Sequence, residues 1–181
     1  MNFLTIISVR AFSTCLLAFL LVAKTTFAAD WPIWGGNGSR NMVSFEKGIN
    51  LDFDPGRMDE DEVVDMKTTK NIKWIAKLGS QAYGNVTVAD GRVYAGTNNE
   101  SPRDPTKKGD RGIVMCFDEK TGKLNWQLVI PKLGAGKVSD WEYIGICSSP
   151  AIEGNRAYIV TNKCEVVCVD VEGLKNGNEG P

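Results

Sequence analysis

Short runs of apolar and β-favouring residues, separated by polar turns, dominate the chain from residue 71 onwards. Residues 113–118 and 124–130 are two such runs, and the polar stretch 119–123 between them contains a glycine. Glycine supplies the positive φ that a tight turn can require, and such a turn between two apolar runs is typical of a β-hairpin. The stretch 112–127 therefore predicts a strand, a turn and a second strand.

The segment before this hairpin predicts further strands. Residues 71–77 alternate between polar and apolar positions, which predicts a lone strand. Asp90-Gly91 lies between the apolar runs 86–89 and 92–97, and Asp-Gly in this position is among the strongest short signals for a hairpin. Residues 98–110 are rich in Pro, Lys, Asp and Gly without periodicity, so we expect an exposed loop there.

The pattern occurs twice along the chain. Residues 88–99, VADGRVYAGTNN, match residues 152–163, IEGNRAYIVTNK, and VMCFD at 114–118 matches VVCVD at 166–170. The first copy has the longer loop between its two matching parts. Repeats of roughly fifty residues, each with strands joined by hairpins, are typical of β-propeller blades.

These patterns predict an all-β fold class, namely a partial β-propeller of four-stranded antiparallel blades, with about two blades in residues 71–181. Residues 86–130 predict one blade, and residues 148–171 predict the first three strands of the next. Two blades leave their edges unpaired and cannot close a ring. We therefore expect an N-terminal fragment of a longer protein, with an incomplete ring.

The first residues predict export. Arg10 precedes an apolar run over residues 11–23, and the small residues Thr26 and Ala28 suit cleavage after Ala28. The run is short for a membrane span, so we predict a signal peptide over residues 1–28 and a periplasmic or extracellular location. Lys24 inside the cleavage region leaves an uncleaved membrane anchor as the alternative.

Residues 29–70 predict an N-terminal segment followed by an acidic linker. Trp31 and Trp34 flank Pro32, and we expect this stretch to pack back onto the domain; a stacking site for a ring-shaped ligand is the alternative. The acidic run 59–62 lacks the ligand spacing and the glycine of a calcium loop. A solvated surface loop is expected there.

The amino-acid composition limits the kinds of functional site that the chain can form. The formal net charge of −1 provides no basic field for nucleic acid. The chain has no histidine, which removes that residue from any triad, acid–base step, haem ligation or zinc site. Cys164 and Cys168 lie too far apart on one predicted strand to bond each other, so Cys147 with Cys164 is the pairing to test first. Buried free thiols, with Cys116 among them, are the alternative.

Residues 116–126 read CFDEKTGKLNW. This stretch resembles the tryptophan-docking motif A-x-D-x-x-T-G-K-x-x-W of the pyrroloquinoline-quinone (PQQ) type, quinoprotein alcohol dehydrogenase-like β-propellers, with Cys at the first position in place of Ala. The resemblance implies that Asp118, Thr121, Gly122, Lys123 and Trp126 are structural residues and that the tryptophan packs between neighbouring blades. An indole can stack on a neighbouring backbone while its N–H finds an acceptor, which agrees with this role.

Two further stretches bear on the resemblance. Trp74 has the corresponding position in the preceding predicted strand and is expected to dock in the same way. The second repeat departs from the motif, because after Asp170 it lacks T-G-K and a following tryptophan. The resemblance covers residues 71–170 well and the start of the N-terminal segment more loosely.

Two functions from different classes fit the resemblance. We favour an exported propeller that binds a protein or polymer partner on its face and has no catalytic site in this chain. The alternative is the N-terminal part of a PQQ- and calcium-dependent alcohol or sugar dehydrogenase. Active members of that family are similar to one another in a catalytic aspartate and often in a vicinal disulfide. Here no carboxylate can be matched to that aspartate, and no Cys-Cys pair occurs.

Three acidic positions are candidate sites. Asp118 and Asp170 have the same hairpin position in the two repeats, where an aspartate typically caps the turn by accepting hydrogen bonds from backbone amides. The third is the cluster Asp140-Trp141-Glu142-Tyr143, the only aromatic and acidic group that could face the propeller axis as a ligand site. Packing in a surface loop is the expectation for this cluster.

Overall fold

The computed structural model describes residues 29–134, 140–173 and 175, and the predicted signal peptide over residues 1–28 lies outside this part. The elements, in chain order, are β1 (Arg57–Met58), β2 (Val64–Asp65), the 3-10 turn η1 (Met66–Thr68), β3 (Thr87–Ala89), β4 (Arg92–Asn98), β5 (Arg111–Asp118), β6 (Leu124–Pro131), β7 (Ala151–Glu153), β8 (Arg156–Val160) and β9 (Val166–Asp170). Within the described residues no helix is long and apolar enough to cross a membrane.

Strands β3 to β6 form one four-stranded antiparallel sheet in chain order. Asp90 and Gly91 join β3 to β4 with φ values of 48° and 72°, the conformation of the two-residue hairpin turn that this dipeptide favours. The turn between β5 and β6 has Gly122 at a φ of 70°. Both predicted hairpins are confirmed.

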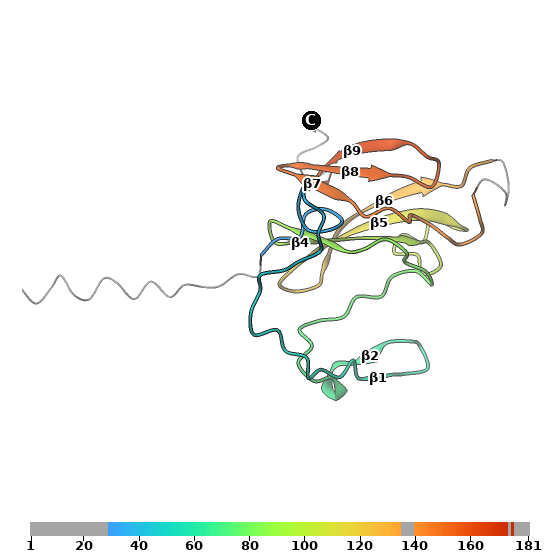
Figure 1. Cartoon of the computed structure of the whole chain (residues 1–181). Helices are drawn as coiled ribbons and strands as arrows, with labels where there is room; N and C mark the ends of the chain where they lie inside the picture. Colours follow the sequence, from blue (N-terminus) through green and yellow to red (C-terminus); the bar gives the residue numbers. More distant parts are fainter. Residues whose placement is uncertain (1–28, 135–139, 174, 176–181) are drawn as a thin grey trace, which may run out of the picture.

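Strands β7, β8 and β9 form a second antiparallel sheet in chain order. Figure 1 shows this sheet, in orange and red, as a layer that stacks on the layer of β4, β5 and β6. The first strands of the two sheets, β3 and β7, also contact each other. A four-stranded sheet packed against its own repeat is the arrangement of neighbouring propeller blades. The predicted all-β, partial propeller is therefore confirmed.

The core lies between the two sheets and is built by both. One buried cluster contains Tyr94 and Cys116 of the first sheet with Ala157 of the second. Another brings Val114 and Ile159 together through Ile146, a residue of the segment that connects the sheets.

Strand β5 is also buried on its opposite face, where Ile113, Met115 and Phe117 form a third cluster. A strand that is buried on both faces has no position for a solvent-facing polar residue. This explains why residues 112–117 of β5 form an unbroken apolar run rather than an alternating pattern.

The prediction of a lone strand at residues 71–77 is wrong. Among the described residues this stretch pairs with no strand of a sheet. Its alternate side chains instead lie against the outer face of β5: the rings of Trp74 and Phe117 are 6.3 Å apart, and Ala76 packs against the same cluster. Alternation reports one packed side and one exposed side, and a single extended segment satisfies it without backbone pairing.

The N-terminal segment packs on both blades at its start. Trp31 forms an isolated antiparallel bridge with Val88 on β3. The carbonyl oxygen of Pro32 accepts a hydrogen bond of 2.8 Å from the N–H of Ile152 on β7. The expected return of this segment to the domain is confirmed for Trp31, whereas Trp34 is 50% exposed.

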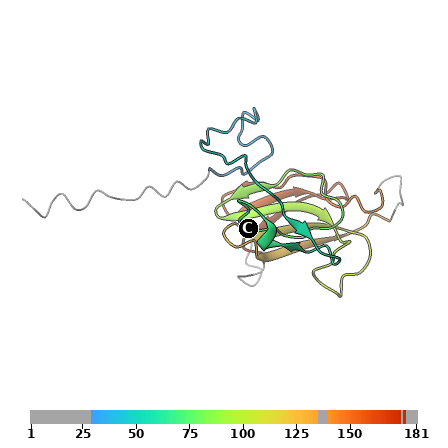
Figure 2. The same cartoon turned by 90° about the horizontal axis from the view of Figure 1, so that it is seen from below.

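The rest of this segment leaves the sheets and ends in the small β1–β2 hairpin, as Figures 1 and 2 show. All four residues of the acidic run 59–62 are exposed. The carboxylate of Asp59 accepts hydrogen bonds from the N–H groups of Asp61 (3.0 Å) and Val63 (2.8 Å). The expected surface loop is confirmed, and its first aspartate holds the turn.

The loop between β4 and β5 is exposed over most of its length, as predicted. Asn99 is the buried exception, and its side-chain amide donates to the carbonyl oxygens of Lys107 (2.5 Å) and Gly109 (3.0 Å). These bonds close the loop on itself, so that β5 can return beside β4.

Candidate functional site

The turn between β5 and β6 is held by the carboxylate of Asp118. Its Oδ1 accepts hydrogen bonds from the backbone N–H (2.8 Å) and the hydroxyl (2.6 Å) of Thr121. The N–H of Gly122 donates a hydrogen bond to the carbonyl oxygen of Asp118 (2.8 Å). The N–H of Asp118 donates a hydrogen bond to the carbonyl oxygen of Lys123 (2.8 Å). The hydrogen bonds from Thr121 lower the pKa of Asp118 below its usual range. The carboxylate is thus engaged in capping the turn.

Trp74 packs on this turn. A Cβ added at Gly122 would lie 2.5 Å from Cδ2 of the Trp74 ring. The indole N–H of Trp74 donates a hydrogen bond of 2.8 Å to the carbonyl oxygen of Glu119. Glycine is needed here for two reasons, the positive φ and the close approach of the ring.

Trp126 repeats this arrangement on the second blade. Its indole N–H donates a hydrogen bond of 2.8 Å to the carbonyl oxygen of Val171, and a Cβ at Gly173 would lie 2.8 Å from its Cδ1. Gly173 also has a positive φ, of 67°. Donor and acceptor are 45 residues apart for Trp74 and again for Trp126. We call this contact the indole–turn joint.

The second repeat keeps the accepting half of the indole–turn joint, although it departs from the motif. Oδ1 of Asp170 accepts from the N–H of Glu172 (2.8 Å), and the N–H of Gly173 donates to the carbonyl oxygen of Asp170 (3.0 Å). Comparison with the literal motif overlooks Gly173. The signal for it was a glycine just after the second hairpin aspartate, at almost the same distance from Trp126 as Gly122 is from Trp74.

A joint that recurs from blade to blade is typical of a repeat family. The family model described as outer membrane protein assembly factor BamB matches residues 56–173, which is more than half of the chain. The chain belongs to this family of PQQ-type β-propeller repeats. A comparison with curated proteins finds no match.

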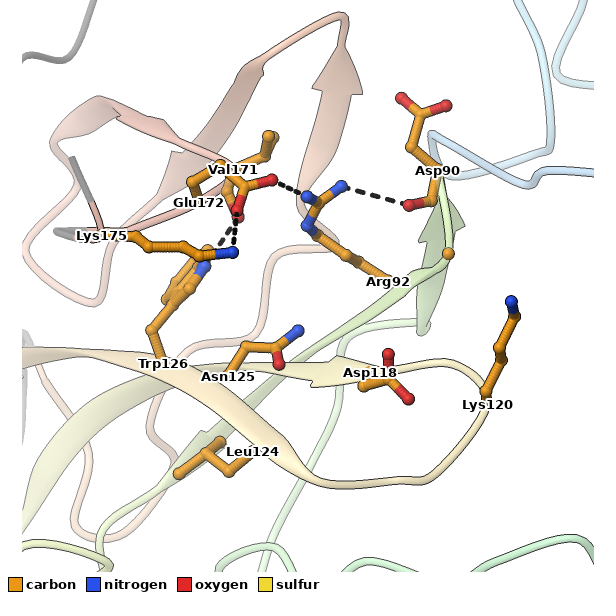
Figure 3. Close-up of a pocket in the computed structure, with 11 residues that line it drawn as sticks. Asp90, Arg92, Asp118, Lys120, Leu124, Asn125, Trp126, Val171, Glu172 and Lys175 are labelled. Atoms are coloured by element: carbon orange, nitrogen blue, oxygen red, sulfur yellow. Dashed lines mark hydrogen bonds and ion pairs between the residues drawn. The ribbon is translucent and has the colours of Figure 1, made fainter.

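The docking turns of this BamB-type chain border a hollow of about 760 Å³ between the two blades. Figure 3 shows Arg92 of β4 directed toward Glu172 of the second blade, with which it forms an ion pair. Lys175 lies 3.4 Å from the other oxygen of Glu172. Asp118 and Lys120 lie on the first blade's side of the same hollow.

The charges around this inter-blade hollow are of both signs. An ion pair that is partly open to water stabilises a fold by less than about 1 kcal/mol. The Arg92–Glu172 pair therefore links the two blades but adds little to their stability. The lining also includes the apolar side chains of Leu124, Trp126 and Val171.

The candidate cluster at residues 140–143 divides into an inner part and an outer part. The side chain of Asp140 is 3% exposed and lies 2.5 Å from Nζ of Lys132. Its Oδ2 accepts from the N–H of Leu133 (2.8 Å) and the side-chain amide of Asn162 (2.8 Å). Trp141 and Tyr143, by contrast, are 62% and 41% exposed. Surface-loop packing is therefore correct for these two aromatic residues and wrong for Asp140.

The environment of Asp140 decides its charge. Burial by itself would raise its pKa, but the hydrogen bonds from Lys132, Leu133 and Asn162 and the charge of Lys132 hold that pKa below its usual range. The carboxylate is thus an ionised part of a polar network between the end of β6, the connecting segment and the end of β8.

The described residues do not fit the calcium site that the dehydrogenase alternative implies. Calcium takes six to eight oxygen ligands, among them several carboxylates. In the part of the chain that the structure describes, no three His, Cys, Asp or Glu side chains are grouped to hold a metal ion. The carboxylates of Asp118 and Asp140 are already engaged by Thr121 and Lys132.

The two N-terminal tryptophans, Trp31 and Trp34, differ in how they pack. A Cβ at Gly36 would lie 2.9 Å from the ring of Trp31, so this ring packs on its own turn. Trp34 and Tyr83 line a small hollow of about 240 Å³ on the surface. The alternative of a stacking site therefore rests on Trp34 and Tyr83 alone.

The cysteines differ in their exposure. Cys116, Cys147, Cys164 and Cys168 are all free thiols, and Cys116 is the buried one while the other three are exposed. Burial raises the pKa of the Cys116 thiol to about 11. The alternative of a buried free thiol thus describes Cys116 only.

Proposed function

We propose that this chain forms blades of an exported propeller that works as a binding scaffold for a protein partner. The observation that carries the proposal is the match of residues 56–173 to the family described as an outer membrane protein assembly factor. By that description, the family acts on other proteins. The signal peptide predicted over residues 1–28 supports export to the periplasm or the cell exterior.

The placement of the motif residues supports the same function. Asp118 and Gly122 build a turn, and Trp126 joins two blades, so these residues are engaged in architecture. We propose that they are structural in the whole protein as well. In a scaffold the partner is bound by surface residues, while the repeat residues hold the surface in shape.

The N-terminal segment provides a surface of the kind that partners bind. Several large apolar side chains are exposed along it, and exposed apolar side chains gathered in one segment are candidates for burial against a partner. These are Met42, Val43, Phe45, Ile49, Leu51, Phe53, Met58, Val63 and Met66, of which Phe45 is 88% and Leu51 is 85% exposed. We propose that this apolar segment contacts the partner.

The proposal is tested in the cells that make the protein. A photo-crosslinking amino acid at position 45 or 51 should give one discrete protein adduct, because both side chains lie on the apolar segment. The same amino acid at the exposed position 107, in the β4–β5 loop, is the matched control. Equal adducts at all three positions, or none at positions 45 and 51, would contradict the scaffold.

A second experiment addresses catalysis. The protein is titrated with PQQ and calcium and assayed for dye-linked oxidation of alcohols and sugars. The scaffold proposal expects no change in the quinone spectrum and no oxidation. Quinone-dependent oxidation would overturn it and establish the dehydrogenase.

A further inference from the structure

We propose that Cys147 and Cys164 are a redox pair that closes a disulfide between the segment connecting the two blades and the β8–β9 turn. Both thiols line one surface hollow of about 260 Å³. One lies just before the second blade and the other lies between β8 and β9. The sequence alone favours this pairing, and the shared hollow adds a structural reason for it.

Backbone contacts bring the two cysteines to the same point. The hydroxyl of Ser148, the neighbour of Cys147, donates a hydrogen bond of 2.7 Å to the carbonyl oxygen of Val160 at the end of β8. The N–H of Cys164 donates to the carbonyl oxygen of Thr161 (3.0 Å), so the turn that carries Cys164 folds back beside the same strand end. Both cysteines therefore lie beside the same strand end, at one hollow.

The other cysteines do not compete for this pairing. Cys116 is buried in the cluster between the two sheets. Cys168 lies opposite Tyr158 in the middle of the β8–β9 pair and does not line the hollow. The expectation that Cys164 and Cys168 share one strand is wrong, because β9 (Val166–Asp170) contains Cys168 and begins after the turn that carries Cys164.

The chemistry needs an external disulfide as oxidant, such as oxidised glutathione. One cysteine thiolate attacks the glutathione disulfide, which forms a mixed disulfide and releases one reduced glutathione. The second cysteine thiolate then attacks the protein sulfur of that mixed disulfide and releases the second glutathione. The two protons lost by the protein thiols end on the two glutathione thiols, and the two electrons reduce the glutathione disulfide.

The link would fasten the connecting segment to the β8–β9 turn of the second blade. That segment also carries Asp140, whose carboxylate binds Lys132 and Asn162 at the same place. Export, as proposed above, would place the pair in an oxidising compartment where such links persist. Pairing in the purified protein does not depend on export or on a partner.

The test uses the reduced protein incubated with oxidised glutathione. Peptide mapping by mass spectrometry should find Cys147 linked to Cys164, with the loss of two hydrogen atoms. The midpoint of thermal unfolding should rise on oxidation and return to its first value when dithiothreitol is added. Cys147→Ser and Cys164→Ser should both abolish the rise, whereas Cys168→Ser should retain it.

Three outcomes would overturn the proposal. They are stable glutathione adducts on both cysteines, a link of either one to Cys168, and a link only between separate molecules. Peptide mapping of the unsubstituted protein distinguishes these outcomes even if a serine variant fails to fold.

Discussion

The indole N–H of Trp126 donates a hydrogen bond of 2.8 Å to the carbonyl oxygen of Val171 in the following blade. The ring of Trp126 lies on Gly173, as that of Trp74 lies on Gly122. A flat ring against a bare backbone, with its one polar atom satisfied, lets two sheets approach closely without leaving a buried donor unpaired.

Trp126→Ala should destabilise the protein by about 3 kcal/mol, the lower end of the range for buried tryptophan because the ring is partly exposed. Trp126→Phe keeps an aromatic ring but removes the N–H donor and part of the ring's contact area, and should cost less, about 2 kcal/mol. Urea unfolding measures both. Trp34→Ala is the control, since Trp34 is 50% exposed, and it should leave the midpoint nearly unchanged. Equal effects at positions 126 and 34 would contradict the joint.

Gly122→Ala and Gly173→Ala should destabilise the protein more than Gly91→Ala. All three glycines have similar positive φ values, of 70°, 67° and 72°. A Cβ at Gly91 meets no atom within 4 Å, whereas one at either of the other two meets an indole ring. Gly91→Ala therefore reports backbone strain alone, about 1 kcal/mol. Unfolding free energies that are the same for all three variants would show that the rings do not press on the turns.

Asp140→Asn should cost about 2 kcal/mol at neutral pH, because it removes the closer carboxylate from the partly buried ammonium of Lys132 and leaves only that of Asp110, 3.4 Å away, among the described residues. The pKa of Asp140 is lowered in the folded protein, so its contribution is complete above the unfolded pKa of about 3.9 and is lost as pH falls through the folded value. The difference between wild type and variant should therefore shrink below about pH 4. Urea midpoints from pH 3 to 7 measure it.

The control for this pH series is Asp61→Asn, in the exposed acidic run. It should leave the unfolding midpoint unchanged across the series. A wild-type advantage over Asp140→Asn that stays constant down to pH 3 would mean that the carboxylate charge is not what stabilises the network.

Cys116 should react with iodoacetamide at least a hundred times more slowly than Cys168 in the folded, reduced protein. With a pKa of about 11, roughly one Cys116 thiol in a thousand is ionised at pH 8, and the thiol is buried as well. Mass spectrometry of tryptic peptides over time measures both rates. In urea the two cysteines should react alike. Rapid labelling of Cys116 without denaturant would contradict the packing of the two sheets.

The hairpins could be predicted because their signals are local in the sequence. The contacts between residues far apart in the sequence could not be predicted in this way. Asp90-Gly91 and the glycine at position 122 lie within the turns that they form, so a few neighbouring residues predict them. The acceptor of Trp126 lies 45 residues further along the chain, in a turn that has lost the T-G-K letters. No short sequence pattern predicts that the ring of Trp126 would pack on Gly173.

The candidate site at Asp140 was hard to predict for a similar reason. Its burial depends on Lys132 and Asn162, which come from two other segments of the chain. In the sequence, an aspartate followed by two exposed aromatic residues is typical of a surface loop, and only the fold shows which of them turns inward. The strand predicted at residues 71–77 failed because alternation reports burial and cannot report a hydrogen-bonding neighbour.

The indole–turn joint has a consequence for how such a gene can grow. The first blade carries a receiving glycine in the turn before its last strand and a donating tryptophan on that strand itself. A duplicated copy of this unit would already contain both the receiving glycine and the donating tryptophan. It would fit between existing neighbours with no new interface to evolve, so duplication alone can lengthen the array.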